Sequence, residues 1–168
     1  MKGQPDLVRG WLRKAASDLV AMRASAQAGS LDAACFHAQQ AAEKYLKAYL
    51  IDQNQAVPHT HNLYKLFALC SESDPAFQQL IDTADLLTPF AVEARYDTEF
   101  WPTLQTLEQA EAAANRIARF VSARVQSARI PAFGIHEAWK AARDQFGWRS
   151  IWDISRTQVN TSPNSSTA

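Results

Sequence analysis

Apolar residues recur every three or four positions along most of the chain. The cleanest example runs from about Leu31 to Gln53, with Ser30 as the candidate N-cap, and its 3.6-residue period indicates a helix with one buried face. The buried positions expected there are Leu31, Ala34, Cys35, Ala38, Ala41, Ala42, Tyr45, Leu46 and Tyr49. Neither a sustained two-residue alternation nor an Asn-Gly or Asp-Gly turn occurs, so the sequence gives no sign of strands.

Four further helices follow from the same pattern and its punctuation. They are expected at about 6–27, from His61 to about Cys70, from the pair Asp74-Pro75 onward, and from near Pro102 onward. Thr60 or His61 is the expected cap of the third helix, and Pro89 is expected to kink or break the fourth. The positions expected to face inward in the last helix are Leu104, Leu107, Ala110, Ala114, Ile117, Ala118 and Val121. The sequence therefore predicts an all-α fold, an antiparallel up-and-down bundle of about five helices with a short C-terminal helical extension.

The domain organisation follows from length and from changes of character along the chain. The 168 residues suit one domain with a proper core, which we expect at 6–126. Residues 127–156 should form a helical extension that docks on an apolar surface, either of its own bundle or of a partner, because they hold Trp139, Trp148 and Trp152. Residues 157–168 are rich in Ser, Thr and Asn and are expected to be a disordered tail.

Composition and charge narrow the class of protein. Hydrophobic residues make up 47% and charged residues 20%, which is typical of a folded globular protein. Residues 1–122 carry 11 Lys/Arg against 14 Asp/Glu, and residues 123–168 carry 6 against 3, so the bundle is mildly acidic. An acidic body argues against indiscriminate nucleic-acid binding, which needs a net basic face.

We expect the protein in the cytoplasm. No window approaches the roughly 18 uncharged apolar residues of a membrane span, and the start of the chain lacks the apolar run of a secretory signal. Cys35 and Cys70 each stand among apolar residues, which favours buried free thiols in a reducing compartment.

One flank of the helix over 31–53 carries polar side chains that suit a ligand. His37, Gln40 and Lys44 follow each other at i, i+3 and i+7 along the edge of the apolar face. Such a flank can line a groove for a phosphate or a base, although an ordinary helix boundary has the same pattern. Phe36 and Leu50 fall outside the expected buried face, which indicates a self-association surface.

A second group of functional side chains lies between the fourth and fifth helices. Arg95, Tyr96 and Asp97 stand there within a nine-residue stretch that also holds Glu93, Glu99 and Trp101. Arginine recognises phosphate bidentately and an aromatic ring offers a stacking face to a base. A salt-bridged loop with a tucked aromatic ring is the alternative interpretation.

The sequence gives no reason to expect a metal or a cofactor. His59 and His61 form a His-x-His pair, but no third histidine or cysteine stands at a suitable spacing for zinc. No two glycines are close enough for a P-loop or a dinucleotide-binding fingerprint.

The run from Phe36 to Ala48, FHAQQAAEKYLKA, resembles the second-helix signature of HEPN domains. The pieces Ala15-Ala16-Ser17-Asp18-Leu19, His61-Asn62-Leu63 and Ala94-Arg95-Tyr96 are similar to the family in order and spacing, over about residues 8–125. The resemblance implies an up-and-down helical domain that forms homodimers. Many members are paired with a minimal nucleotidyltransferase, often as toxin–antitoxin modules, and the most similar branch was proposed to bind nucleotides. Other members cut RNA with an Arg-x4–6-His motif in a cleft across the dimer.

The chain departs from the ribonuclease motif. Phe100, Trp101 and Pro102 stand where the histidine after Arg95 should be, and none of them can transfer a proton. We therefore predict no catalytic residue and a role in binding a nucleotide, an RNA phosphate or a nucleotidyltransferase partner. The residues predicted to bind the ligand are Arg95, Tyr96 and Asp97, faced by His37, Gln40, Lys44 and His61. The alternatives are a metal-independent endoribonuclease that borrows His37 or His61, and a structural adaptor that acts through its extension.

Overall fold

The computed structural model describes residues 3–91 and 97–125, and every regular element in these two ranges is a helix. The three long helices are α1 (Gln4–Gln27), α2 (Leu31–Asp52) and α6 (Leu104–Ser122). Between α2 and α6 lie α3 (Leu63–Ser73), the 3-10 segment η1 (Pro75–Leu80), the short α4 (Asp82–Leu87) and a second 3-10 segment, η2 (Thr88–Ala91). The predicted all-α helical bundle is confirmed, and Met1–Ile130 form one compact unit.

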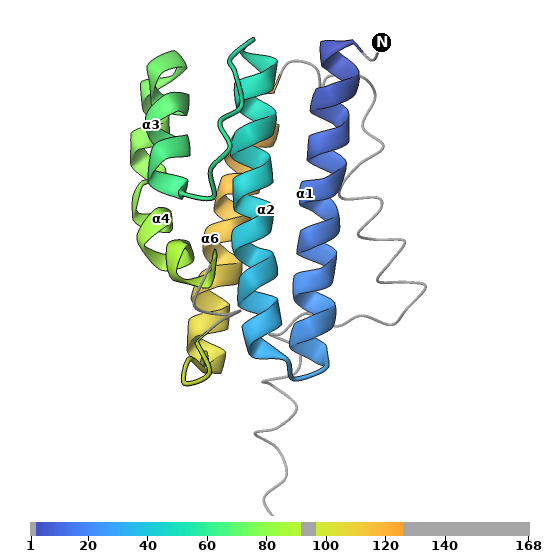
Figure 1. Ribbon diagram of the computed structural model, residues 1–168, viewed down its shortest axis with the longest axis vertical. Coiled ribbons are helices and arrows are strands. Elements are labelled where there is room, and N and C mark those ends of the chain that lie inside the picture. The colour runs from blue at the N-terminus through green and yellow to red at the C-terminus, as the bar shows by residue number, and fades with distance from the viewer. Residues whose placement is uncertain (1–2, 92–96, 126–168) are drawn as a thin grey trace, which may run out of the picture. The chain divides into compact units, whose positions relative to one another are not determined.

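Helix α2 is the central element of this unit. It packs along α1 on one side, with α6 behind it and α3 on the side away from α1 (Figure 1). Of the buried positions predicted for α2, all but the half-buried Leu31 are buried. The alanines of this face let the neighbouring helices approach closely, while Tyr45 and Leu46 fill the core without any exposed surface.

The connection between α2 and α3 runs back along α2 without forming a helix. Residues 53–62 return along α2, so that His61 lies beside Glu43 and α3 then runs in the same direction as α2 (Figure 1). Asn54 begins this return with a left-handed backbone (φ 57°), a conformation that asparagine tolerates better than most residues. The η1–α4–η2 segment runs back against α6, tied to it by Asp74–Arg124 and Asp82–Arg116 pairs.

Capping was predicted only in part. The N-cap of α3 is Asn62, whose Oδ1 accepts from the Lys65 amide at 3.1 Å, so the prediction of Thr60 or His61 was wrong. Asp74 caps the next segment, because its Oδ1 accepts from the Ala76 amide at 2.9 Å, but this segment is a 3-10 helix rather than the α-helix expected from Asp74-Pro75 onward. The helix break expected at Pro89 is present: α4 ends at Leu87, and the 3-10 segment η2, which contains Pro89, follows it.

Two apolar positions were misjudged. Leu104 was expected to face inward, but it stands in the first turn of α6 with 62% of its surface exposed. Leu50 was expected on the surface, but it is fully buried. The end of α2 is enclosed, because the Gln4 side chain donates to the Ile51 carbonyl at 2.6 Å and the following turn folds back onto the Leu50 carbonyl. The self-association surface predicted from Phe36 and Leu50 is therefore wrong.

Cys35 and Cys70 are free and fully buried, as predicted. Burial raises the pKa of each thiol to about 12, because the thiolate would lose its hydration. Within the described ranges, no helix combines the length and the apolar character that crossing a membrane requires. The extension at 127–156 and the tail at 157–168 lie outside the described residues, and what was expected of them stays a prediction.

Leu50→Ala should destabilise the protein by about 2–5 kcal/mol, because it leaves a cavity in the core. Leu104→Ala removes the same atoms from an exposed site and should change the free energy of unfolding by less than about 0.5 kcal/mol. Urea unfolding of both variants measures the difference. Equal losses would contradict the burial of Leu50 at the end of α2.

Candidate functional site

The buried carboxylate of Asp18 joins two of the predicted ligand residues. It lies on α1, 8% exposed, and faces α2. Its Oδ1 is 3.1 Å from His37 Nδ1, and its Oδ2 accepts from Lys44 Nζ. His37 and Lys44 are two helical turns apart on α2, so a single carboxylate fixes both. We call Asp18, His37 and Lys44 the Asp18 cluster.

The Asp18 cluster keeps hydrogen-bonding capacity toward solvent. The side chains of His37 and Lys44 are 30% and 22% exposed, so each reaches the surface at the edge of α2. An ammonium has three donors, of which Asp18 takes one. With the proton of His37 on Nδ1, its Nε2 accepts in the neutral ring and donates in the protonated ring.

A second buried carboxylate, that of Glu43, collects three partners. Lys47 Nζ lies 2.8 Å from its Oε1, one helical turn further along α2. His61 Nδ1 lies 3.1 Å and Gln39 Nε2 3.2 Å from its Oε2. We call Gln39, Glu43, Lys47 and His61 the Glu43 cluster. In contrast to the Asp18 cluster, its charged pair is nearly closed to solvent, with the Glu43 and Lys47 side chains 4% and 8% exposed.

Gln40 and Trp11 extend the Glu43 cluster. Gln40 Nε2 donates to Gln39 Oε1 at 2.8 Å, and Gln40 stands one turn from both His37 and Lys44 on α2. Lys47 Nζ lies 5.8 Å from the centre of the Trp11 ring of α1, within cation–π range. The structure thus places His37 and Lys44 on one carboxylate, and Gln40 and His61 in the network of the other.

Each cluster combines one carboxylate with one ammonium. Both are electrically neutral while their imidazoles are neutral, and protonation of an imidazole makes a cluster cationic. Arg23 belongs to neither cluster. It binds Glu111 at 3.0 Å and so joins α1 to α6, and burial lowers the pKa of its guanidinium. In the described part of the chain, no group of three His, Cys, Asp or Glu is arranged to hold a metal ion.

Of the predicted loop residues, Arg95 and Tyr96 lie outside the described residues. Asp97 is exposed, and its Oδ1 accepts from the Glu99 amide at 2.9 Å, which forms a local turn. That turn precedes Trp101, whose indole donates to the Thr98 carbonyl at 3.1 Å while 74% of the residue stays exposed. Trp101 is therefore not the tucked aromatic ring of the alternative interpretation. That Asp97 faces the α2 flank stays a prediction.

Five residues of the two clusters and their surroundings were not predicted as site residues: Trp11, Asp18, Gln39, Glu43 and Lys47. Asp18 had a signal in the sequence, because it stands between the apolar positions Ala15 and Leu19 of α1, where a carboxylate is costly without a partner. Glu43 and Lys47 had another, since opposite charges at i and i+4 meet on a helix.

Glu43→Ala should destabilise the protein by about 3–5 kcal/mol, because it leaves the buried Lys47 ammonium without its counter-ion. Asp82→Ala removes an acid from an exposed pair with Arg116 and should cost less than about 1 kcal/mol. Thermal and urea unfolding test this. If both variants lose the same amount, the Glu43 cluster is not the closed pair that the geometry indicates.

Comparison with known proteins agrees with the fold and with the resemblance seen in the sequence. The model of the HEPN domain matches residues 8–128. TT1696 from Thermus thermophilus is similar in structure, with a TM-score of 0.63 and 29% identity over 69% of this chain and 96% of that one. ST0689, an archaeal HEPN homologue, shares the fold, with a TM-score of 0.57 and 24% identity over 75% of this chain and all of that one. A search of curated proteins gave no match. The family match covers most of the chain, which therefore belongs to the HEPN domain family.

Proposed function

We propose that the chain binds a phosphate group, of a nucleotide or of an RNA backbone, on the α2 flank of His37, Gln40 and Lys44. The observation that carries this proposal is the Asp18 cluster. One buried carboxylate holds an ammonium and an imidazole at the half-exposed edge of α2, and both keep donors or potential donors toward solvent.

The Asp18 carboxylate favours binding by fixing its partners in advance. A free lysine loses rotamer freedom when it closes on a ligand, whereas Lys44 is already held by Asp18. The Gln40 amide lies between His37 and Lys44 and adds a neutral donor. These three side chains offer an ammonium, an amide and an imidazole to one anion.

The Asp18 cluster alone attracts an anion only weakly, because Asp18 offsets the charge of Lys44. A further cation is needed, and Arg95 is the residue that we propose for it, with Tyr96 and Asp97 beside it. The exposed indole of Trp101 supports a stacking role for the same loop. His61 joins the proposed site through the Glu43 cluster rather than through the Asp18 carboxylate.

The assembly in which this site acts is proposed from the family. A homodimer, and a minimal nucleotidyltransferase partner in a toxin–antitoxin-like system of the cytoplasm, are what the resemblance implies. Phe36 and Leu50 no longer support the homodimer, because Leu50 is buried. The proposal therefore needs another surface for self-association.

Binding of ATP or a short single-stranded RNA should weaken about 10- to 150-fold in Arg95→Ala, the range for a lost charge-assisted hydrogen bond. Lys44→Ala should also weaken binding. The matched control is Lys65→Ala, which removes the same charge from an exposed position on α3. Calorimetric titration, with the melting temperature of each variant, measures these effects. No binding by the unmodified protein, or an equal loss in Lys65→Ala, would refute a phosphate site on this flank.

A ribonuclease is the second candidate, favoured by one feature of the clusters. His37 and His61 each place Nδ1 on a carboxylate, an arrangement that orients an imidazole for proton transfer. Against it, the positions after Arg95 lack a histidine: Phe100 packs on the Phe90 ring at 5.9 Å, and Trp101 is exposed.

We expect the purified protein not to cleave single-stranded RNA at a useful rate, because positioned acid–base catalysis worth about 10²–10⁴-fold is missing beside Arg95. The assay compares the unmodified protein with Arg95→Ala, His37→Ala and His61→Ala. Robust cleavage that disappears in both Arg95→Ala and His37→Ala would replace the binding proposal with the ribonuclease.

A further inference from the structure

Gly10 stands inside α1 at a position where nothing in the described chain requires a glycine. Its backbone is ordinary right-handed helix, in contrast to Gly29, whose φ is +79°. A Cβ atom added at Gly10 would meet no atom within 4 Å. Glycine is a poor helix former, so its use in the interior of a 24-residue helix calls for another reason. A glycine lets a second backbone approach the helix closely.

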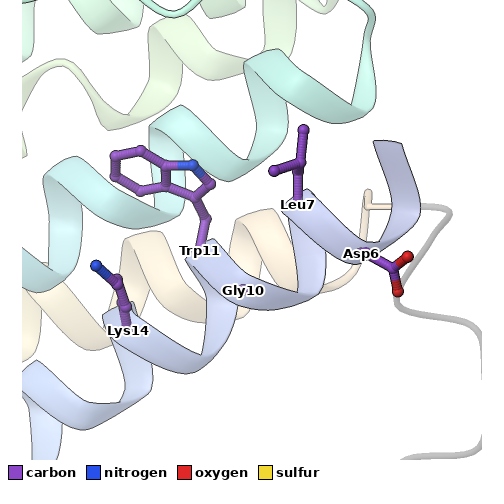
Figure 2. Close-up of a pocket in the computed structure, with 5 residues that line it drawn as sticks. All are labelled: Asp6, Leu7, Gly10, Trp11 and Lys14. Atoms are coloured by element: carbon purple, nitrogen blue, oxygen red, sulfur yellow. The ribbon is translucent and has the colours of Figure 1, made fainter. Parts of the chain in front are cut away.

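The surface around Gly10 is hollowed. A groove of about 230 Å³ lies on α1, lined by Asp6, Leu7, Gly10, Trp11 and Lys14 (Figure 2). Leu7, Trp11 and Lys14 rise on one side of Gly10 and Asp6 points to the other (Figure 2). Leu7 is 45% exposed and adds apolar surface to the groove. The groove thus combines an apolar wall with a floor that has no side chain.

Along α1, the residues before and after Gly10 carry charges of opposite sign. Asp6 stands four residues before Gly10, and Arg13 and Lys14 stand three and four residues after it, all three exposed. In an antiparallel pair of α1 helices that cross at Gly10, Asp6 of each copy comes level with Arg13 and Lys14 of the other. A parallel pair would bring like charges together. Asp6 also binds Arg9 of its own chain, and a carboxylate accepts from more than one cation.

We propose that the α1 face around Gly10 is an interface for a second copy of this chain, with two antiparallel α1 helices crossing at Gly10 on a two-fold axis. A two-fold interface must be complementary to itself, and the charges of this face are arranged in that way. The interface gives the homodimer of the proposed function its surface, and it rests on that homodimer but not on the ligand.

Filling the groove tests the interface without disturbing the single chain. Gly10→Leu places a side chain where a Cβ has open space, and leucine is a good helix former. The full-length variant should be a monomer by light scattering at micromolar concentration, with an unchanged or higher melting temperature, while the unmodified chain is a dimer. A monomeric unmodified chain, or a variant as dimeric as the unmodified chain, would overturn the proposal.

Charge reversal tests the antiparallel two-fold register. Asp6→Lys places like charges level in a pair of identical variants, and Arg13→Glu with Lys14→Glu does so with the opposite sign. Each variant alone should dimerise about tenfold more weakly, since attraction is lost and repulsion gained at two symmetric places. The mixture should form a heterodimer, because every facing pair then has opposite charges. A mixture that associates no better than its components would exclude this register, whatever else covers the groove.

Disulfide cross-linking locates the axis itself. Two Gly10→Cys copies meet at the crossing and should oxidise to a covalent dimer, which requires Cα atoms within about 7 Å. Ala24→Cys is the matched control, since it is also exposed on α1 but lies about 21 Å along the helix from Gly10. The native Cys35 and Cys70 are fully buried and should not interfere. Equal cross-linking at both positions would reject an axis at Gly10.

The interface at Gly10 and the phosphate site on α2 can fail independently of each other. If Gly10→Leu abolishes the dimer and ATP or RNA does not bind the unmodified chain, the interface stands and the ligand site falls. If Lys44→Ala and Arg95→Ala weaken binding, as the titration expects, but Gly10→Leu leaves the dimer intact, the ligand site stands and the interface at Gly10 is overturned.

Discussion

Two carboxylates inside the bundle, those of Asp18 and Glu43, must be neutralised and hydrogen-bonded, and much of the structure around α2 follows from that. Transferring a carboxylate out of water is costly unless cations and donors replace its hydration. Asp18 finds an ammonium and an imidazole, and Glu43 finds an ammonium, an imidazole and an amide. All these partners lie on α2 except His61, so α2 holds the polar centre of the molecule as well as its apolar core.

This requirement links the register of α1 on α2 to the path of the chain beyond α2. A slip of α1 by one turn would move Asp18 about 5.4 Å away from its two partners and leave a buried charge. Glu43 imposes a similar condition on residues 53–62, because His61 reaches its carboxylate only when this connection returns along α2. A turn that led straight into an antiparallel α3 would leave Glu43 with fewer partners. The backward connection and the direction of α3 are thus consistent with the needs of one carboxylate.

The same residues show what the sequence can and cannot predict. The buried face of α2 was predictable because alanine and larger apolar residues recur there every three or four positions, which is a clear helical period. The period identifies a face but not where the neighbouring helices end, so Leu50 and Leu104 were both assigned to the wrong environment. Asn62 was missed as a cap because it follows two other candidates, Thr60 and His61. His37 and Lys44 were recognised by their spacing on one helix, whereas their common partner Asp18 depends on the packing of two helices.

The proposed interface and the polar clusters share one residue, Trp11. Its ring forms part of the groove at Gly10 and lies under the Lys47 ammonium of the Glu43 cluster. A second copy seated on Gly10 would cover this ring, and a ring shielded from water attracts the Lys47 ammonium beside it more strongly. If dimerisation changes the free energy of the Glu43 cluster, a change in the cluster must shift the dimerisation equilibrium by the same free energy, because such coupling is reciprocal. His61 belongs to that cluster and to the proposed ligand site, so Trp11 and Lys47 would connect the proposed self-association on α1 with the proposed binding on α2.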